Sequence, residues 1–239
     1  MSALNDPALV AREYADETGL STRIAAQQNS SGPDPWDVTF DAVAEPGPKT
    51  ILEIGPGRGE FAERLQRDLG VRVTAVDQSE RMVELTAARG VEAIVGDVQN
   101  LPFTDSSFDC AVAAWMLYHV SDLDRGLSEV RRVLRPGGRL VAVTNSARTM
   151  PELWDLLPGT SSRADGFSAE NGEEALRRHF DVAERRDVHG VVVFADRDAA
   201  HRYVSASPRW AHLADDLPPF DGPLVATKHV VVFVAERSA

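Results

Sequence analysis

The sequence predicts an α/β fold in which a mostly parallel sheet carries helices on both faces. Between Lys49 and Val143, short apolar segments alternate with segments of helical periodicity, and turn residues separate them. Strands and helices alternating at this spacing form a doubly wound parallel sheet, because each helix returns the chain to the edge where the next strand begins. Beyond Thr144 the alternation ends, and two further strands flank a long excursion. We therefore expect a seven-stranded domain over residues 49–239, preceded by a helical segment.

Residues 1–48 predict helices that come before the sheet. Asp6 is a favourable N-cap for a helix over residues 7–17, and further helices are expected from Ser21 and from near Trp36. Proline and glycine then break the helical pattern before the first strand. This segment is long enough to form a helical lid over the ends of the strands.

Apolar runs bounded by turn residues define the sheet. The expected strands are residues 51–54, 71–76, 91–95, 108–114, 140–143, 182–194 and 230–234. The intervening helices carry one apolar stripe each, and glycine or proline ends them. We expect the sixth strand to be interrupted at His189 and Gly190, a pair typical of a bulge. Residues 195–229 form an excursion with a short helix near 199–204.

The composition argues against several classes of partner. The 239 residues carry a formal charge of −12, with 43% hydrophobic and 26% charged residues, which are ordinary proportions for a globular domain. Binding a phosphate backbone needs a clustered basic face. The tight cluster of Arg131, Arg132 and Arg135 lies at a predicted helix C-terminus, where cations favour the helix dipole. No nucleic-acid partner is therefore expected.

The sequence also predicts no disulfide or catalytic cysteine, no metal site and no signal peptide or membrane helix. Cys110 is the sole cysteine and lies in an apolar strand, so neither a disulfide nor a catalytic thiol is expected. The histidines and acids show no ligand spacing such as H-E-x-x-H, so no metal is expected. The N-terminus lacks a signal-peptide pattern, and no apolar run approaches the ~20 residues of a membrane helix. These patterns predict a cytoplasmic protein without a membrane partner.

The most informative segment is residues 51–59. An apolar strand containing Glu53 leads into three alternate glycines, Gly55, Gly57 and Gly59, and a helical pattern begins directly after them. Glycine permits a tight turn against which a ligand can lie, and the turn aims unpaired N–H groups of the helix at the crevice. The spacing differs from the G-x-G-x-x-G of dinucleotide-binding proteins, because the third glycine arrives one residue early. A nicotinamide-dependent dehydrogenase is therefore not favoured.

Two acids follow at the ends of the next two strands. Asp77 lies about twenty residues past the glycines, the offset at which a carboxylate can accept both hydroxyls of a ribose. Asp97 follows the third strand. Either acid can instead cap a helix or start a turn. We expect Gly57, Asp77 and Asp97 to meet in one cleft, because the ends of neighbouring parallel strands share one edge of the sheet.

The pattern E-x-G-x-G-x-G, followed by these two acids, resembles the first motifs of the class I S-adenosylmethionine (SAM)-dependent methyltransferases. The resemblance covers about Thr50 to Asn145, and residues 116–120 and 133–140 look like the ubiquinone-biosynthesis-type branch (methyltransferase domain 11-like). That branch mostly methylates small molecules. The resemblance implies a Rossmann-like sheet with an antiparallel last strand, SAM as cofactor and S-adenosylhomocysteine as product.

The resemblance also implies a set of cofactor-binding residues. In the family, the glycine turn meets the amino-acid end of SAM, and the next strand ends meet the ribose, the adenine and the methionine portion. The corresponding residues here are Tyr14, Glu53, Gly55, Gly57, Gly59, Asp77, Gln78, Met82, Asp97, Val98, Ala114 and Trp115. Tyr14 and Met82 are equally compatible with core packing. Pro56 departs from the family pattern, because it has no N–H to offer a ligand.

His119 is the candidate catalytic residue, because it follows the fourth strand at the mouth of the expected crevice. A sulfonium methyl is already electrophilic, so the protein mainly aligns the acceptor and excludes water. A hydroxyl or amine acceptor benefits from a general base, and histidine suits that role near neutral pH. His119 can instead contact cofactor or acceptor, or orient its own loop. Residues 195–229, with Tyr203, are expected to form an acceptor-side insertion.

Several functions are compatible with these motifs. The leading hypothesis is methylation of a small molecule at oxygen or nitrogen. Lys49 and Lys228 are the only lysines, a composition that indicates a GC-rich bacterial genome, where such enzymes often tailor secondary metabolites. Alternatives are a cyclase or decarboxylase of the same fold, and a non-catalytic methyltransferase-like subunit. The oligomeric state stays open, with a homodimer as one expectation.

Overall fold

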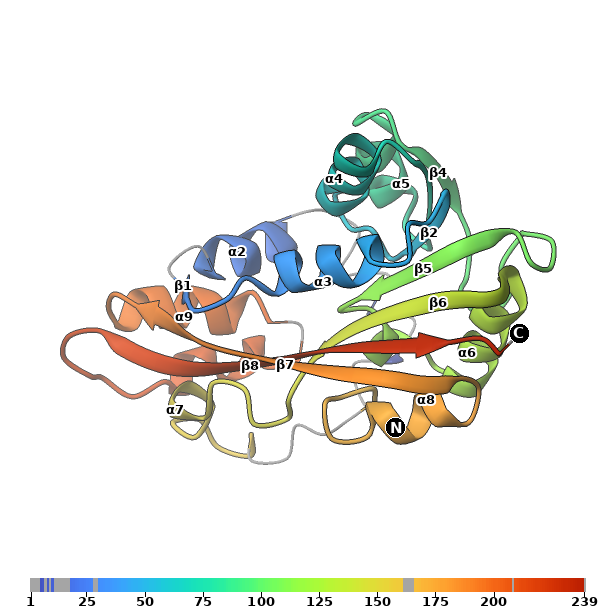
Figure 1. Ribbon diagram of the computed structural model, residues 1–239. Helices are drawn as coiled ribbons and strands as arrows, with labels where there is room; N and C mark the ends of the chain where they lie inside the picture. The colour runs from blue at the N-terminus through green and yellow to red at the C-terminus, as the bar shows by residue number, and fades with distance from the viewer. Residues whose placement is uncertain are drawn as a thin grey trace.

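The computed structural model describes residues 5, 6, 8, 10, 18–27, 30–160, 166–207 and 209–238. A sheet of eight strands runs through it in the order β1-β7-β8-β6-β5-β2-β3-β4 (Figure 1). The strands are β1 (Ser30–Ser31), β2 (Thr50–Ile54), β3 (Arg72–Asp77), β4 (Glu92–Val95), β5 (Phe108–Ala114), β6 (Leu134–Asn145), β7 (Asp181–Phe194) and β8 (Leu224–Glu236). The helices are α2 (Thr18–Gln27), α3 (Pro35–Ala44), α4 (Glu60–Leu69), α5 (Glu80–Ala87), η2 (Leu117–His119), α6 (Leu123–Val133), α7 (Pro151–Trp154), α8 (Gly172–Arg177), α9 (Arg197–Ser205) and η3 (Ala211–Asp216).

The strand directions confirm the expected fold class. Strands β2, β3, β4, β5 and β6 are all parallel to one another. Strand β8 is antiparallel to both β6 and β7, so β7 runs in the same direction as the central strands. The sheet is therefore mostly parallel and doubly wound, and its last strand is antiparallel.

Each face of the sheet has its own apolar core. On one face, residues such as Ile51 and Val141 pack with α3 and α4, and on the other, residues such as Leu52 and Leu140 pack with α6 and α8. Figure 1 shows these helix pairs on opposite sides of the sheet. Successive strand residues point to opposite faces of the sheet. Because helices cover both faces, nearly every residue of a central strand is buried, which explains the nearly continuous apolar runs in this sequence.

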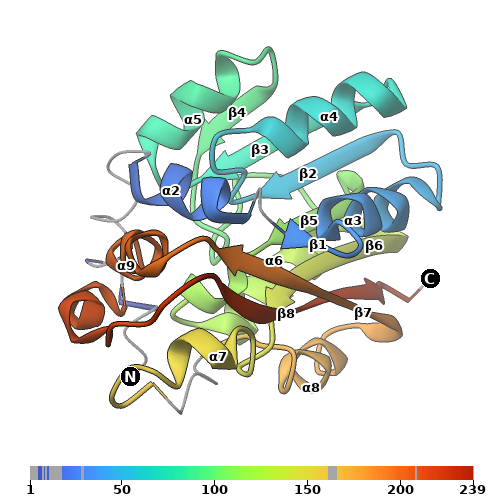
Figure 2. The ribbon, with the colours of Figure 1, turned by 90° about the vertical axis from the view of Figure 1, so that its left-hand side faces the viewer.

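A third apolar cluster lies beyond the ends of the central strands. There the far ends of β7 and β8 pack with α7, α9 and η3, around Trp154, Tyr203 and Trp210. Helix α2 contacts α9 and lies in front of the ends of the central strands (Figure 2). The helix expected over residues 7–17 falls mostly outside the described residues. The excursion after β7 thus lies next to the edge of the sheet where ligands bind in α/β folds.

The structure adds an eighth strand to the seven expected. Ser30 and Ser31 pair antiparallel with the edge of β7, although their polar sequence gives no strand signal. The expected interruption at His189 and Gly190 was wrong, because the β7 register runs without a shift from Glu184 to the end of the strand. Gly190 is needed for another reason: a Cβ there would clash with the Ser31 carbonyl oxygen of β1.

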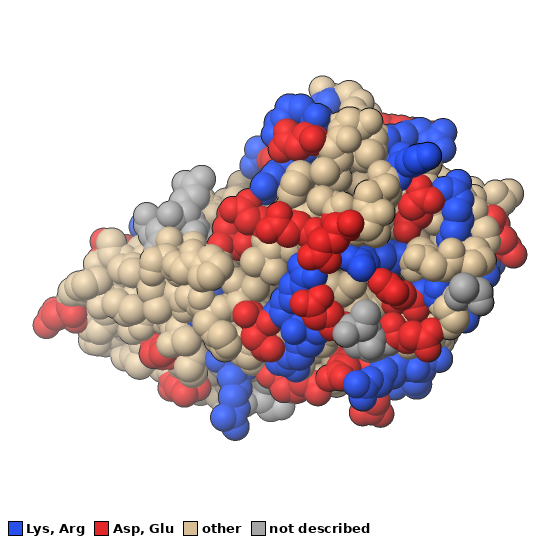
Figure 3. Space-filling view, viewed as in Figure 1, with Lys and Arg blue, Asp and Glu red and all other residues tan. Residues whose placement is uncertain are grey.

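The surface carries charges of both signs. On the face shown in Figure 3, acidic and basic side chains are interspersed over the central part of the molecule, and the end beside α9 carries few of either. Arg139 and Arg186 both pair with Glu45 and thereby join the end of α3 to the sheet. In the part of the chain that the structure describes, no helix is long and apolar enough to cross a membrane.

Candidate functional site

The ends of the central strands open into a cavity of about 540 Å³. One side of it, called here the glycine-loop wall, consists of Gly55, Gly57, Asp77, Gln78, Gly96 and Val98. The aromatic lining, called here the aromatic wall, consists of Trp36, Phe61, Trp115, Tyr118, His119 and Tyr203, together with Leu20, Arg23 and Ile24 of α2. Ala114 and Asn145, the last residues of β5 and β6, also line the cavity. A crevice outside the carboxyl ends of parallel strands is the usual ligand site of this fold class.

The glycine turn requires glycine at each of its three positions. Gly55, Gly57 and Gly59 all have positive φ, at 67°, 57° and 79°, a region that other residues rarely adopt. A Cβ on Gly55 would lie 2.9 Å from Met116 Cβ, and one on Gly59 would lie 2.8 Å from the Cα of Thr86. The turn can therefore approach α5 and the segment after β5 only without side chains, and its bare backbone borders the cavity.

Asp77 is held at the end of β3 beside this turn. Burial raises the pKa of its carboxyl to about 6, although hydrogen bonds from the backbone N–H groups of Ser79, Gly57 and Gln78 act in the opposite direction. The bond from Ser79 measures 2.9 Å. A buried carboxylate with this environment is stabilised by further donors, and a pair of ligand hydroxyls at the cavity surface would supply them.

Glu53 lies behind the glycine turn and is only 2% exposed. Burial raises its pKa to about 8, and the nearby acids Glu60 and Asp77 add to that effect. Its Oε2 atom has no hydrogen-bond partner among the described residues. A buried polar atom without a partner is costly. A cationic ligand group held by the turn would supply Glu53 Oε2 with a hydrogen-bond donor.

Four other positions that the sequence predicted as cofactor-binding do not line the cavity. Asp97 lies between Gly96 and Val98, which do, but its carboxylate accepts hydrogen bonds from the backbone and side chain of Gln99. Met82 is fully buried away from the cavity, which favours the core role. Glu53 lies on β2 and Gly59 is the last glycine of the turn, and neither lines the cavity. Tyr14 lies outside the described residues.

Trp115 anchors the aromatic wall. Its φ of 52° is unusual for a residue other than glycine, and such strain is concentrated at functional sites. The backbone N–H donates to the Val143 carbonyl at 2.9 Å and the indole Nε1 to Asn145 Oδ1 at 3.1 Å. Trp36 packs edge-on against Trp115 and also contacts Phe61, with ring centroids 4.7 and 4.8 Å apart. The result is a continuous aromatic surface with one fixed orientation.

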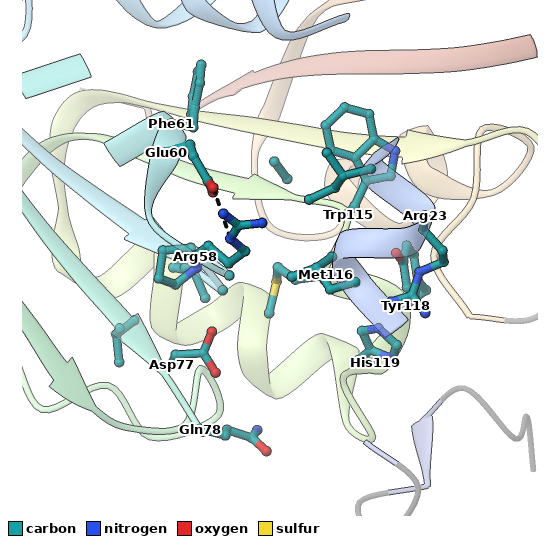
Figure 4. A pocket seen from close by; sticks show the side chains of 18 of the residues that line it. Arg23, Arg58, Glu60, Phe61, Asp77, Gln78, Trp115, Met116, Tyr118 and His119 are labelled. Atoms are coloured by element: carbon teal, nitrogen blue, oxygen red, sulfur yellow. Dashed lines mark ion pairs between the residues drawn. The ribbon is translucent and has the colours of Figure 1, made fainter. Parts of the chain in front are cut away.

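His119 lies in η2, directly after β5 and across the cavity from Asp77 and Gln78 (Figure 4). Its backbone N–H donates to the Met116 carbonyl at 2.9 Å, and its ring contacts that of Tyr118 with centroids 4.5 Å apart. The structure therefore brings His119 into the cavity together with the predicted positions Gly55, Gly57, Asp77, Gln78, Val98, Ala114 and Trp115.

Helix α2 contacts both the glycine turn and α9. Ser21 accepts a hydrogen bond from Arg58 of the glycine turn at 3.2 Å, and Arg23 donates to the carbonyl of Ala206 after α9 at 2.6 Å. Leu20 approaches Gly57. No sequence motif marks these α2 residues, Arg58 or Asn145, so they were not predicted as site residues. The helical pattern of residues 1–48, which predicts a lid over the strand ends, is the one sequence feature that indicated this region.

Comparisons with known proteins agree with this site. A family model described as a methyltransferase domain matches residues 52–142. Demethylmenaquinone methyltransferase of Thermotoga maritima is 36% identical over 53% of this chain and 52% of its own length. A ubiquinone/menaquinone biosynthesis C-methyltransferase, UbiE of Hahella chejuensis, is 32% identical over 60% of this chain and 66% of its own length. The chain thus spans half to two thirds of these relatives.

Among solved structures, the [4+2]-cyclase SpnF superposes with a TM-score of 0.66 over 96% of this chain and 95% of its own, at 23% identity. That likeness shows the fold alone. The matched family, the glycine turn and the acids at successive strand ends agree, and together they define the cofactor class. Residues 52–142 therefore match a methyltransferase domain, and the glycine turn and strand-end acids within them follow the class I S-adenosylmethionine-dependent pattern.

Proposed function

We propose that this chain transfers the methyl group of SAM to an oxygen or nitrogen atom of a small molecule. One observation carries the proposal: the glycine-loop wall and the aromatic wall enclose a single cavity of about 540 Å³. A cofactor on the first wall and an acceptor on the second would share that space. Methyl transfer needs this arrangement, because the acceptor atom must lie in line with the bond that breaks.

The residues of the glycine-loop wall fit the cofactor. Asp77 and Gln78 would hold the ribose hydroxyls, and Gly55 and Gly57 would lie against the amino-acid end. The unpartnered Oε2 of Glu53 behind the turn favours a ligand with a positive charge there, which SAM has in its ammonium group. Gly96 and Val98 would border the adenine. Asp97 would act indirectly, because its hydrogen bonds with Gln99 hold the turn that positions Gly96 and Val98. When bound, SAM supplies an electrophilic sulfonium methyl.

The aromatic wall favours a flat, mainly apolar acceptor. Trp36, Phe61 and Trp115 present ring faces and edges to the cavity, and aromatic rings pack well against other rings. Tyr203 and Ile24 extend this surface. We propose that residues 1–48 act as the lid and residues 195–229 as the acceptor-side insertion. The cavity-lining positions of Leu20, Ile24 and Tyr203 support both roles.

His119 is proposed as the general base. It belongs to the aromatic wall, on the opposite side of the cavity from Asp77 (Figure 4). A hydroxyl or amine of the acceptor would donate its proton to the imidazole as the new bond to the methyl carbon forms. The rest of the wall would exclude water and hold the acceptor in one orientation.

The test is incubation of the purified chain with SAM labelled in the methyl carbon and a panel of small phenols, hydroxylated quinones and aromatic amines. We expect S-adenosylhomocysteine and methylated product to form in equal amounts. The carbon chemical shift of the new methyl group identifies the bonded atom. This matters because one relative is named a C-methyltransferase. Conversion of an acceptor without S-adenosylhomocysteine would contradict methyl transfer and support the cyclase or decarboxylase alternative.

A further inference from the structure

A cluster of potential metal ligands lies on the β7–β8 pair, outside the cavity. Asp187, His189 and His229 place one ligand atom each within 4.8 Å of one another, and none of the three lines the cavity. In the sequence, His229 follows His189 by 40 residues and Asp187 by 42, which is why ligand-spacing rules predicted no metal site. The strand pairing brings it opposite His189.

The backbone of the two strands fixes the geometry of the cluster. His189 and His229 are direct partners in the antiparallel register, and such partners have Cβ atoms about 4.5–5.5 Å apart on one face. Their rings stack with centroids 4.3 Å apart and an angle of 26°. Asp187 precedes His189 by two residues and so lies on the same face. All three side chains reach the solvent side of a rigid strand pair.

The ligand set matches a late first-row divalent cation. Two imidazoles and one carboxylate, with water as the fourth ligand, form a common tetrahedral zinc environment. Ligand atoms about 2.0–2.2 Å from a tetrahedral ion lie roughly 3.3–3.6 Å apart. His229 Nε2 and Asp187 Oδ1 are now 2.7 Å apart in a hydrogen bond. An imidazole lone pair lies in the plane of its ring, so an ion would replace the shared proton once the two stacked rings turn to aim one nitrogen each at it. Asp187 and His189 are exposed and His229 is half-buried.

Arg185 both favours and opposes such a site. Its guanidinium donates to both oxygens of Asp187, at 2.8 and 2.9 Å. These bonds fix the carboxylate in place, as outer-shell partners do in metal sites, and with His229 they hold the pKa of Asp187 well below its usual range. The same positive charge repels a cation. The site should therefore bind more weakly than a dedicated structural zinc site.

We propose that Asp187, His189 and His229 form a zinc-binding site that clamps β7 to β8. His229 also connects to the active-site edge: its carbonyl accepts from Ser146, and its N–H donates to Thr149. Ser146 follows Asn145, which lines the cavity. A bound ion would thus stiffen the strand pair that supports the segment after β6.

The test is calorimetric titration of the untagged, EDTA-treated chain with zinc chloride in a non-chelating buffer at pH 7.5. We expect one ion per chain, and at least tenfold weaker binding in His189→Ala and in His229→Ala. His201→Ala serves as the matched control, because His201 pairs with Asp215 and belongs to no cluster of three potential metal ligands among the described residues. It should bind zinc as the unchanged chain does.

Cobalt gives a second readout that does not depend on heat. Co²⁺ bound to this ligand set should give visible absorption bands, and Asp187→Asn should alter them. Absence of zinc binding by the unchanged chain would overturn the proposal. Equal binding by the His189→Ala, His229→Ala double variant, with a circular dichroism spectrum that shows it folded, would overturn it too. Neither result would bear on methyl transfer.

Discussion

The glycine-loop wall is made by the ends of three successive strands, whereas the aromatic wall is assembled from α2, α3, the start of α4, the segment after β5, and α9. In the glycine-loop wall, the position of each residue is determined by the end of the strand that it follows or terminates. In the aromatic wall, Trp36, Trp115 and Tyr203 meet only when separate elements pack correctly. We infer that the first wall serves cofactor binding on its own and the second serves the acceptor, so substitutions in the two walls should have separable effects.

The largest effect is expected at Gly59, beneath the glycine-loop wall. Gly59→Ala introduces a left-handed alanine, which costs about 1–2 kcal/mol, and a contact at 2.8 Å with the backbone of α5. We expect a loss of about 2–4 kcal/mol in the free energy of unfolding and severely weakened cofactor binding. Urea unfolding and calorimetry with S-adenosylhomocysteine measure these effects.

Gly70→Ala is the matched control at the other end of α4. Its φ is 65°, and a Cβ there would meet nothing within 4 Å. It should lose only the cost of the left-handed conformation. If both variants lost the same stability, close approach to Thr86 would not be the reason for glycine at position 59.

Asp77→Asn should weaken binding of S-adenosylhomocysteine by about 2–3 kcal/mol, roughly 30- to 150-fold, because charge-assisted hydrogen bonds to a diol are lost. Asp97→Asn should have a smaller effect, since Gln99 already occupies that carboxylate. Calorimetry on both variants measures the contrast. The opposite ranking would mean that the adenine side, not the ribose side, dominates the wall.

On the aromatic wall, His119→Asn should lower kcat by about 10²-fold and leave the affinity for S-adenosylhomocysteine within twofold. The assay is methyl transfer to whichever acceptor of the panel reacts, with His201→Asn as a control outside the cavity. A variant with weaker cofactor binding and unchanged kcat would assign His119 to cofactor contact. The separation of the two walls would then fail at this residue.

A pH effect should come from Glu53. With its pKa raised from 4.5 to about 8, the folded protein keeps a proton that the unfolded chain has already released. The stability of the ligand-free protein should therefore fall as pH rises from about 5 to 8, by at most ~1.4 kcal/mol per pH unit. Urea unfolding at several pH values should show this decline, and Glu53→Gln should flatten it. Glu174→Gln, at an exposed position, should keep the slope.

The contrast between the walls also explains what the sequence could predict. Alternating strands and helices, the glycine spacing and the position of Asp77 are local patterns, and they predicted the sheet and the glycine-loop wall. The contacts of Arg23 with α9, and of β1 with Gly190, join distant segments whose sequences carry no signal. Met82 shows a further limit, because periodicity cannot decide whether a buried methionine faces a ligand or the core.

The most direct test of the central claim is a crystal structure of the chain with S-adenosylhomocysteine. We expect the ribose hydroxyls on Asp77, the amino-acid end against Gly55 and Gly57, and the sulfur facing the space between Trp115 and His119. Electron density for the ligand elsewhere, or a cavity filled by protein side chains in the complex, would contradict the central claim.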